Sequence, residues 1–148
     1  MERLTSLFET IDALMKSCDI DYELLVGMKH DESLFTDYTN QRIVNSFLFN
    51  YMKIQDKIGA KLFRGILFEL REIDDESVSM KDMLNRLEKL QLIQSASQWD
   101  TLREIRNAIA HEYPLDTQER LENFTMAIHG YRLLKQMYVT LKGEVGKV

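Results

Sequence analysis

Apolar residues recur every three or four positions along most of this chain, which is the spacing of one face of an α-helix. The first stripe consists of Leu4, Leu7, Phe8, Ile11, Leu14 and Met15. We expect its helix to end near Cys18. The following region, residues 19–39, is mixed and acidic, with Gly27 in its middle. Part of it is expected to be helical, with a loop at about residues 30–38.

A longer stripe begins at about Asn40 and continues to Arg71 without a proline. Its apolar positions are Ile43, Phe47, Tyr51, Ile54, Ile58, Leu62 and Ile66. A helix of about 32 residues rising ~1.5 Å each would be roughly 48 Å long, the longest in the chain. Gly59 and Gly65 lie inside it, where each costs on the order of 1 kcal/mol relative to alanine. They therefore predict close helix contacts or a slight bend. The stretch Asp74-Asp75-Glu76-Ser77 ends the segment.

Three further helices are predicted from capping signals and apolar stripes. The start signals pair a residue with a polar one three positions later: Ser79 with Asp82, Ser95 with Gln98, and Asp116 with Glu119. The second of these helices should turn Trp99, Leu102, Ile105 and Ile109 inward and stop before Pro114. The last should bury Leu121, Phe124, Ile128, Tyr131, Leu134, Tyr138 and Leu141.

Four or five helices with short connections predict an all-α protein, an antiparallel four- to five-helix bundle. With six glycines, one proline and no alternating strand pattern, the composition agrees. The 148 residues fit a single domain, which could bury roughly two-thirds of the surface of the unfolded chain. We expect that domain to span residues 1–148, with a short tail after about residue 142.

The sequence also bears on the cellular compartment. Cys18 is the single cysteine, so it cannot form an intramolecular disulfide. The N-terminus lacks the basic and then uniformly apolar organisation of a signal peptide. No apolar run approaches the roughly 20 residues that span a bilayer. We therefore expect a cytoplasmic protein that does not associate with membranes.

Charge is distributed unevenly around a net value of −5. Residues 1–37 hold three basic and nine acidic side chains, whereas residues 38–71 hold six basic ones against only Asp56 and Glu69. The basic residues of the second segment could offer a positive strip to RNA. Equally, they could be an ordinary solvated face, paired with the acidic N-terminal segment. The sequence leaves both interpretations open.

The most specific chemistry lies in residues 106–113, at the end of a helical run that Pro114 stops. Arg106 is always charged and can grip phosphate oxygens, whereas His111 can transfer a proton near neutral pH. On a regular helix these two residues are ~140° apart, so either a loosened last turn or a second subunit must bring them together. Asn107 is four residues before His111 and therefore its neighbour on the helix surface.

This Arg-x4-His-x-Tyr pattern, made by Arg106, His111 and Tyr113, resembles the motif of HEPN domains, in particular of HepT-type toxins. These are the ribonuclease halves of bacterial toxin-antitoxin pairs whose antitoxin is a small nucleotidyltransferase of the MNT type. Residues 46–59 are similar to the long second helix of that family. The order of helical segments agrees from about residue 1 to residue 142.

The resemblance implies a HEPN-like homodimer with the motif at the dimer cleft. It implies metal-independent cleavage of RNA without a cofactor, with Arg106 and His111 as catalytic residues and Asp56 as the group that orients one of them. It further implies a cognate nucleotidyltransferase antitoxin that transfers AMP to Tyr113. Asn107 is expected to support the site by holding the imidazole or a phosphate oxygen.

Other functions are compatible with the same residues. The chain could be a non-catalytic subunit that binds nucleotide or substrate for a nucleotidyltransferase, or a plain helical dimerisation module. In the last case Arg106 and His111 would simply interact with the final carbonyls of their helix. One cysteine and three scattered histidines lack the spacing of a zinc site, and there is no glycine-rich phosphate loop.

Overall fold

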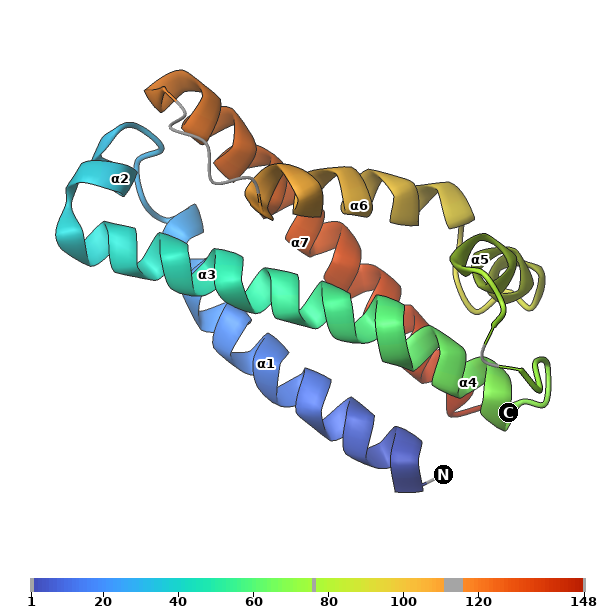
Figure 1. Cartoon of the computed structure of the whole chain (residues 1–148). Coiled ribbons are helices and arrows are strands. Elements are labelled where there is room, and N and C mark those ends of the chain that lie inside the picture. Colours follow the sequence, from blue (N-terminus) through green and yellow to red (C-terminus); the bar gives the residue numbers. More distant parts are fainter. Residues whose placement is uncertain (1, 76, 111–115, 148) are drawn as a thin grey trace.

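The computed structural model describes residues 2–75, 77–110 and 116–147, and within them every regular element is a helix. This confirms the all-α prediction (Figure 1). The elements are α1 (Glu2–Val26), α2 (Ser33–Thr36), α3 (Tyr38–Lys57), the π-helical turn η1 (Ile58–Leu62), α4 (Phe63–Glu69), α5 (Met80–Lys89), α6 (Ala96–Ala110) and α7 (Thr117–Val145).

Four long helical segments form an antiparallel bundle (Figure 1). They are α1, the continuous run α3–η1–α4, α6 and α7. The run α3–η1–α4 packs along α1 in the opposite direction, and α6 and α7 form a second antiparallel pair. The short α5 joins the two pairs at one end of the bundle. The predicted helical bundle is therefore confirmed.

The first helix is longer than the sequence analysis predicted. It continues past Cys18 to Val26 because its buried stripe continues, with Leu25 as inaccessible to solvent as Ile11. Tyr22, between them, packs its ring 5.5 Å from that of Tyr131 on α7. The chain turns near Gly27, and the short α2 lies within the segment expected to be a loop.

The long helix runs without a break from Tyr38 to Glu69, as predicted, but one turn of it is π-helical. Gly59 lies in that turn against the indole of Trp99 on α6. A Cβ atom at Gly59 would lie 2.7 Å from Trp99 Cζ2, closer than packed atoms approach. The ring of Phe63 meets the same indole edge-on, with centroids 4.8 Å apart. The predicted close contact at Gly59 is thus with α6.

Side-chain caps begin the later helices where the sequence placed them. The Ser79 hydroxyl accepts from the backbone N–H of Asp82 at 3.2 Å, and the Asp116 carboxylate accepts from that of Glu119 at 2.8 Å. At α6 the Ser95 hydroxyl accepts from the N–H of Ser97, also at 3.2 Å. Each bond satisfies a donor that the first turn of a helix leaves free.

Carboxylates of α1 face α7. Asp19 accepts from Tyr131 at 2.6 Å and from Lys135 at 2.9 Å. One heptad away, Asp12 accepts in the same way from Tyr138 at 2.7 Å and from Lys142 at 2.6 Å. These two acidic side chains of the N-terminal segment are therefore engaged by the last helix rather than by the basic side chains of α3.

Candidate functional site

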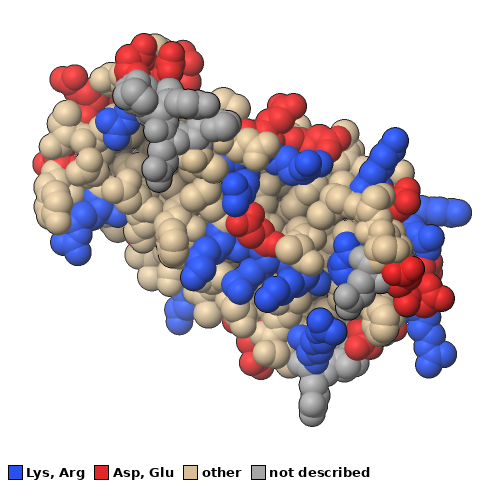
Figure 2. Space-filling view, in the orientation of Figure 1, with Lys and Arg blue, Asp and Glu red and all other residues tan. Residues whose placement is uncertain are grey.

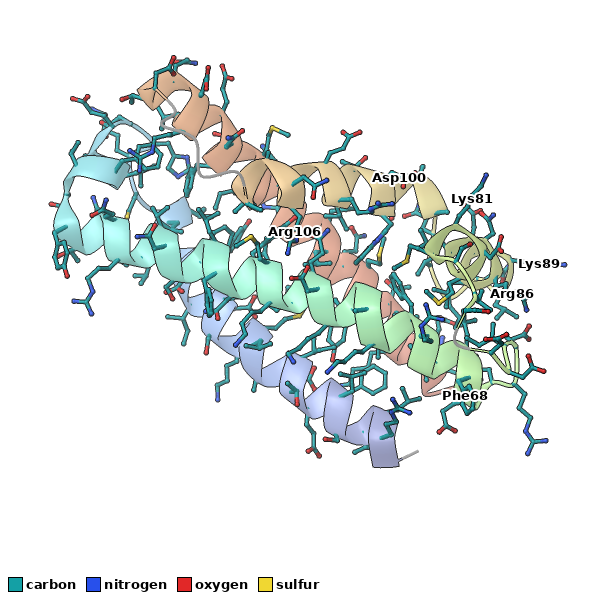
Figure 3. The ribbon with its side chains drawn as sticks, in the orientation of Figure 1. Phe68, Lys81, Arg86, Lys89, Asp100 and Arg106 are labelled. Atoms are coloured by element: carbon teal, nitrogen blue, oxygen red, sulfur yellow. The ribbon has the colours of Figure 1, made fainter. Side chains whose placement is uncertain are left out.

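Arg106 and Asp56, two residues fifty positions apart, meet between α6 and α3. Arg106 Nε donates to Asp56 Oδ1 at 3.0 Å, and Arg106 Nη2 donates to Asp56 Oδ2 at 2.9 Å. This is the bidentate geometry in which guanidinium and carboxylate fit best. Figure 3 shows Arg106 on α6, on the side toward α3. The structure thus brings together the arginine of the motif and the acidic residue expected to orient one of its members.

The pair lies at the surface. The side chain of Arg106 is 33% exposed and that of Asp56 is 53% exposed. Hydrogen bonding to Asp56 raises the pKa of Arg106 above its ordinary value, so the guanidinium is charged at any physiological pH. Because water screens an exposed pair, its contribution to folding is at most about 1 kcal/mol. Its main physical effect is to hold the guanidinium in one orientation.

That orientation leaves part of the guanidinium available. Nε and Nη2 are both used by Asp56, whereas no described residue accepts a hydrogen bond from Nη1. The two N–H groups of Nη1 can therefore bind an oxygen of a ligand without breaking the pair. Asn107, the next residue on α6, is exposed beside it.

His111 and Tyr113 lie outside the described residues, as does the rest of the segment 111–115. α6 ends at Ala110, the residue before His111. Their expected roles as proton-transferring residue and AMP acceptor stay predictions. So does the supporting role of Asn107, which was expected to act on the imidazole or on a bound phosphate.

The surface around Asp56 is basic. Figure 2 shows Lys and Arg side chains gathered in a row on this face, over α3 and its continuation, with acidic atoms within the row. Lys53, Lys57 and Lys61 recur at four-residue intervals along this run, and Arg64 follows. The sequence indicated this strip. Arg3 was not predicted to belong to it, because a single arginine near a terminus forms no sequence pattern with other basic residues. In the structure α1 brings Arg3 to the same surface, beside Lys57 and Lys61.

The described part of the chain has neither a candidate metal cluster nor a helix that could span a membrane. No three His, Cys, Asp or Glu side chains there lie close enough to hold a metal ion together. None of the helices there combines the length and the apolar character needed to cross a membrane.

Comparison with known proteins gives no match: no family model, no curated protein and no solved structure is significantly similar to this chain.

Proposed function

We propose that this protein is a metal-independent endoribonuclease of the HEPN type, the toxin of a toxin-antitoxin pair. One observation carries the proposal: Arg106 is fixed by both oxygens of Asp56 at an exposed surface, with Nη1 left for a ligand. A guanidinium held in this way is prepared to receive a phosphate without reorganising, the condition under which electrostatic stabilisation of a transition state is largest. The basic row beside it supports a polyanionic substrate.

In the proposed reaction the 2′-hydroxyl of RNA attacks the adjacent phosphorus, and the bond to the 5′-oxygen of the next nucleotide breaks. The products are a 2′,3′-cyclic phosphate and a free 5′-hydroxyl. Arg106 stabilises the charge on the nonbridging oxygens. His111 accepts the proton of the attacking hydroxyl or supplies one to the leaving oxygen, a role worth typically ~10²–10⁴ in rate. Asp56 is a positioning residue in this scheme.

Expression in cells tests the function. The wild-type chain should arrest growth and degrade RNA, whereas Arg106→Ala and His111→Ala chains should do neither at equal protein levels. Co-expression of the adjacent gene product should restore growth with the wild type. If a correctly folded His111→Ala chain still cleaves RNA fully, the histidine has no catalytic role. Absence of both arrest and cleavage with the wild type would favour the non-catalytic nucleotide-binding subunit.

The proposed regulation is a covalent modification of Tyr113 by a nucleotidyltransferase antitoxin. The tyrosine oxygen attacks the α-phosphorus of ATP, pyrophosphate leaves, and AMP remains on the ring. The added phosphate repels RNA by the electrostatics that govern phosphorylation. Mass spectrometry after incubation with the partner and ATP should find AMP on the peptide that contains Tyr113, and none on a Tyr113→Phe chain. An unmodified Tyr113 peptide in a neutralised sample would contradict this mechanism.

A further inference from the structure

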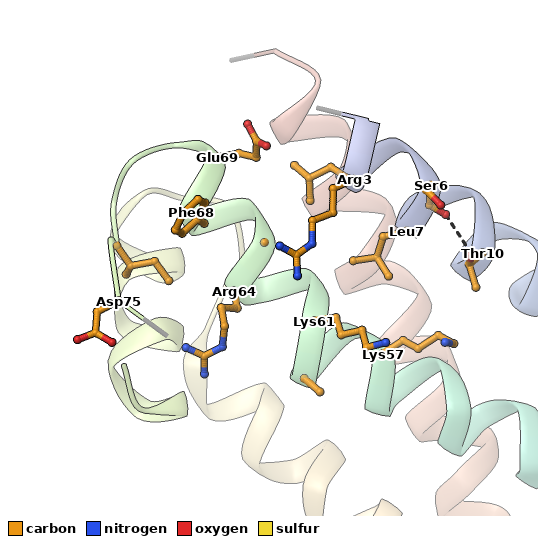
Figure 4. Close-up of a pocket in the computed structure, with 14 residues that line it drawn as sticks. Arg3, Ser6, Leu7, Thr10, Lys57, Lys61, Arg64, Phe68, Glu69 and Asp75 are labelled. Carbon is orange, nitrogen blue, oxygen red and sulfur yellow. Dashed lines mark hydrogen bonds between the residues drawn. The ribbon is translucent and has the colours of Figure 1, made fainter. Parts of the chain in front are cut away.

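A basic hollow lies between the start of α1 and the run η1–α4. It has a volume of about 660 Å³, and four cationic side chains line it: Arg3, Lys57, Lys61 and Arg64. Figure 4 shows Arg3 reaching from α1 toward α4, with Lys57 and Lys61 along the neighbouring helix. Cations from two separate helices thus converge on one open groove.

Most of this positive charge is available to a ligand. Arg3, Lys57 and Lys61 form no hydrogen bond or ion pair with another described residue. Arg64 is fixed in place, since its Nη2 donates to the carbonyl of Val78 at 3.1 Å. Two carboxylates, those of Glu69 and Asp75, also line the hollow. Among the described residues that line the hollow, the cations exceed the carboxylates by two, which favours an anionic ligand.

An exposed aromatic ring completes the groove. Phe68 lines it and is 54% exposed. Elsewhere on a protein surface, a single exposed aromatic residue is ordinary. Here it lies among cations, and a positive groove with an accessible ring is the general design of sites for single-stranded nucleic acid, where bases stack on the ring and cations follow the backbone.

The groove adjoins the site that contains Arg106 along the helical run α3–η1. Lys57, which lines the groove, directly follows Asp56, the partner of Arg106. At ~1.5 Å of rise per residue, about 12 Å of helix separates Asp56 from Arg64. A strand lying along α3, η1 and α4 would therefore meet both places in succession.

We propose that this groove binds the phosphate backbone of single-stranded RNA, stacks one base on Phe68, and leads the strand to Asp56 and Arg106. The inference rests on the proposed ribonuclease function. It adds a substrate class, unpaired RNA, and an anchoring site remote from the bond that is cut.

Binding can be measured separately from cleavage with a fluorescent 2′-O-methyl oligouridylate, which lacks the attacking hydroxyl. The test variant is Lys57→Gln/Lys61→Gln. The matched control is Lys81→Gln/Lys89→Gln, which removes the same charge from exposed lysines of α5, away from the groove (Figure 3). Both are compared with wild type by fluorescence anisotropy over a series of salt concentrations, after circular dichroism has established folding.

The test variant should bind at least about fivefold more weakly than the control. Its slope of log affinity against log salt should be shallower by about 1.4, since each phosphate contact to a single strand contributes about 0.7. Phe68→Ala should weaken binding about fivefold or more with an unchanged slope, because stacking releases no counterions.

Equal affinities and slopes for the two double variants would overturn the proposal. So would tighter binding, dependent on Lys57 and Lys61, to duplex RNA, to free AMP or to vesicles containing phosphatidylserine. Cleavage of the 2′-hydroxyl form of the strand is measured in parallel. Intact cleavage with a dispensable groove removes this inference alone, whereas groove-dependent binding without cleavage removes the ribonuclease proposal and leaves a single-strand-binding protein.

Discussion

At the scale of single residues, the contact between Arg106 and Asp56 adds little to the stability of the fold. A bidentate pair orders two side chains, and at this exposure the gain in folding free energy is at most about 1 kcal/mol. The two hydrogen bonds do, however, hold the guanidinium of Arg106 in one orientation at the surface. The roles proposed for both residues therefore depend on the orientation of the guanidinium and not on the stability of the fold.

Replacing Asp56 by asparagine should therefore affect turnover more than substrate binding. The variant loses the carboxylate that holds Arg106, and misplacement of a catalytic group can cost ~10²-fold in rate. It also loses a negative charge beside the substrate, so KM should stay constant or fall. Steady-state cleavage assays separate kcat from KM. Asp100→Asn, which removes an exposed carboxylate elsewhere on α6, is the control.

Asp56→Glu should recover part of the lost kcat, because glutamate can still accept two hydrogen bonds from the guanidinium. An Asp56→Asn variant with unchanged kcat would contradict the positioning role. A parallel loss of kcat and of unfolding free energy would show that the residue acts through the fold.

At this scale, sequence reasoning reaches only patterns that are local in the chain. The arginine, histidine and tyrosine stand out by their spacing, but no pattern in the chain fixes the distance from Arg106 to Asp56. That contact depends on how α3 and α6 pack. Arg3 shows the same limit, since only the approach of α1 to α4 brings it beside Lys57 and Lys61.

At the scale of elements, helix starts were predictable because caps are short-range chemistry, as at Ser79 and Asp116. The end of α1 was predicted wrongly, since charged residues after Cys18 obscured a stripe that continues through Leu25. The π-helical turn was not predicted either. Gly59 of this turn lies against Trp99 of α6, and periodicity within one helix contains no information about a ring on another.

Gly59→Ala should destabilise the protein although alanine favours helix. The added Cβ would meet Trp99 at 2.7 Å, and overpacking of a core typically costs about 1–3 kcal/mol. Gly143→Ala is a matched control on α7, where a Cβ has nothing within 4 Å, and it should stabilise by up to about 1 kcal/mol. Urea unfolding measures both free energies. Equal stabilisation by the two substitutions would contradict the proposed packing of η1 against α6.

At the scale of the whole molecule, the acidic side chains of α1 that pair with α7 are separate from the basic row over α3. Asp12 and Asp19 hold α1 to α7 through tyrosine and lysine pairs, while the face over α3 presents lysines and arginines (Figure 2). A net charge of −5 is therefore compatible with a local surface that attracts RNA. The all-α character and the helical bundle followed from the sequence, but α2 lies in a segment expected to be a loop. Which charges pair with which helix depends on how the helices pack.

The proposed homodimer can be tested by mixing two inactive chains. If Arg106 of one subunit acts with His111 of the other, an equal mixture of inactive Arg106→Ala and His111→Ala chains should regain about a quarter of wild-type cleavage. Half of the randomly formed dimers are mixed, and each contains one intact site of two. The two chains are unfolded together, refolded and assayed. No recovery in demonstrably mixed dimers would place each site within one subunit.

The catalytic role of Arg106 is tested by the single-turnover rate at which purified Arg106→Ala protein cleaves RNA, compared with wild type and with Arg103→Ala. Arg103 is an exposed arginine one turn earlier on α6, and it is not bonded to Asp56. Loss of an electrostatic stabiliser typically costs ~10²–10³ in rate. We expect that loss for Arg106→Ala, a rate much closer to wild type for Arg103→Ala, and no cleavage of a strand with 2′-deoxy nucleotides. Equal rates for the two arginine variants would contradict the assignment of Arg106.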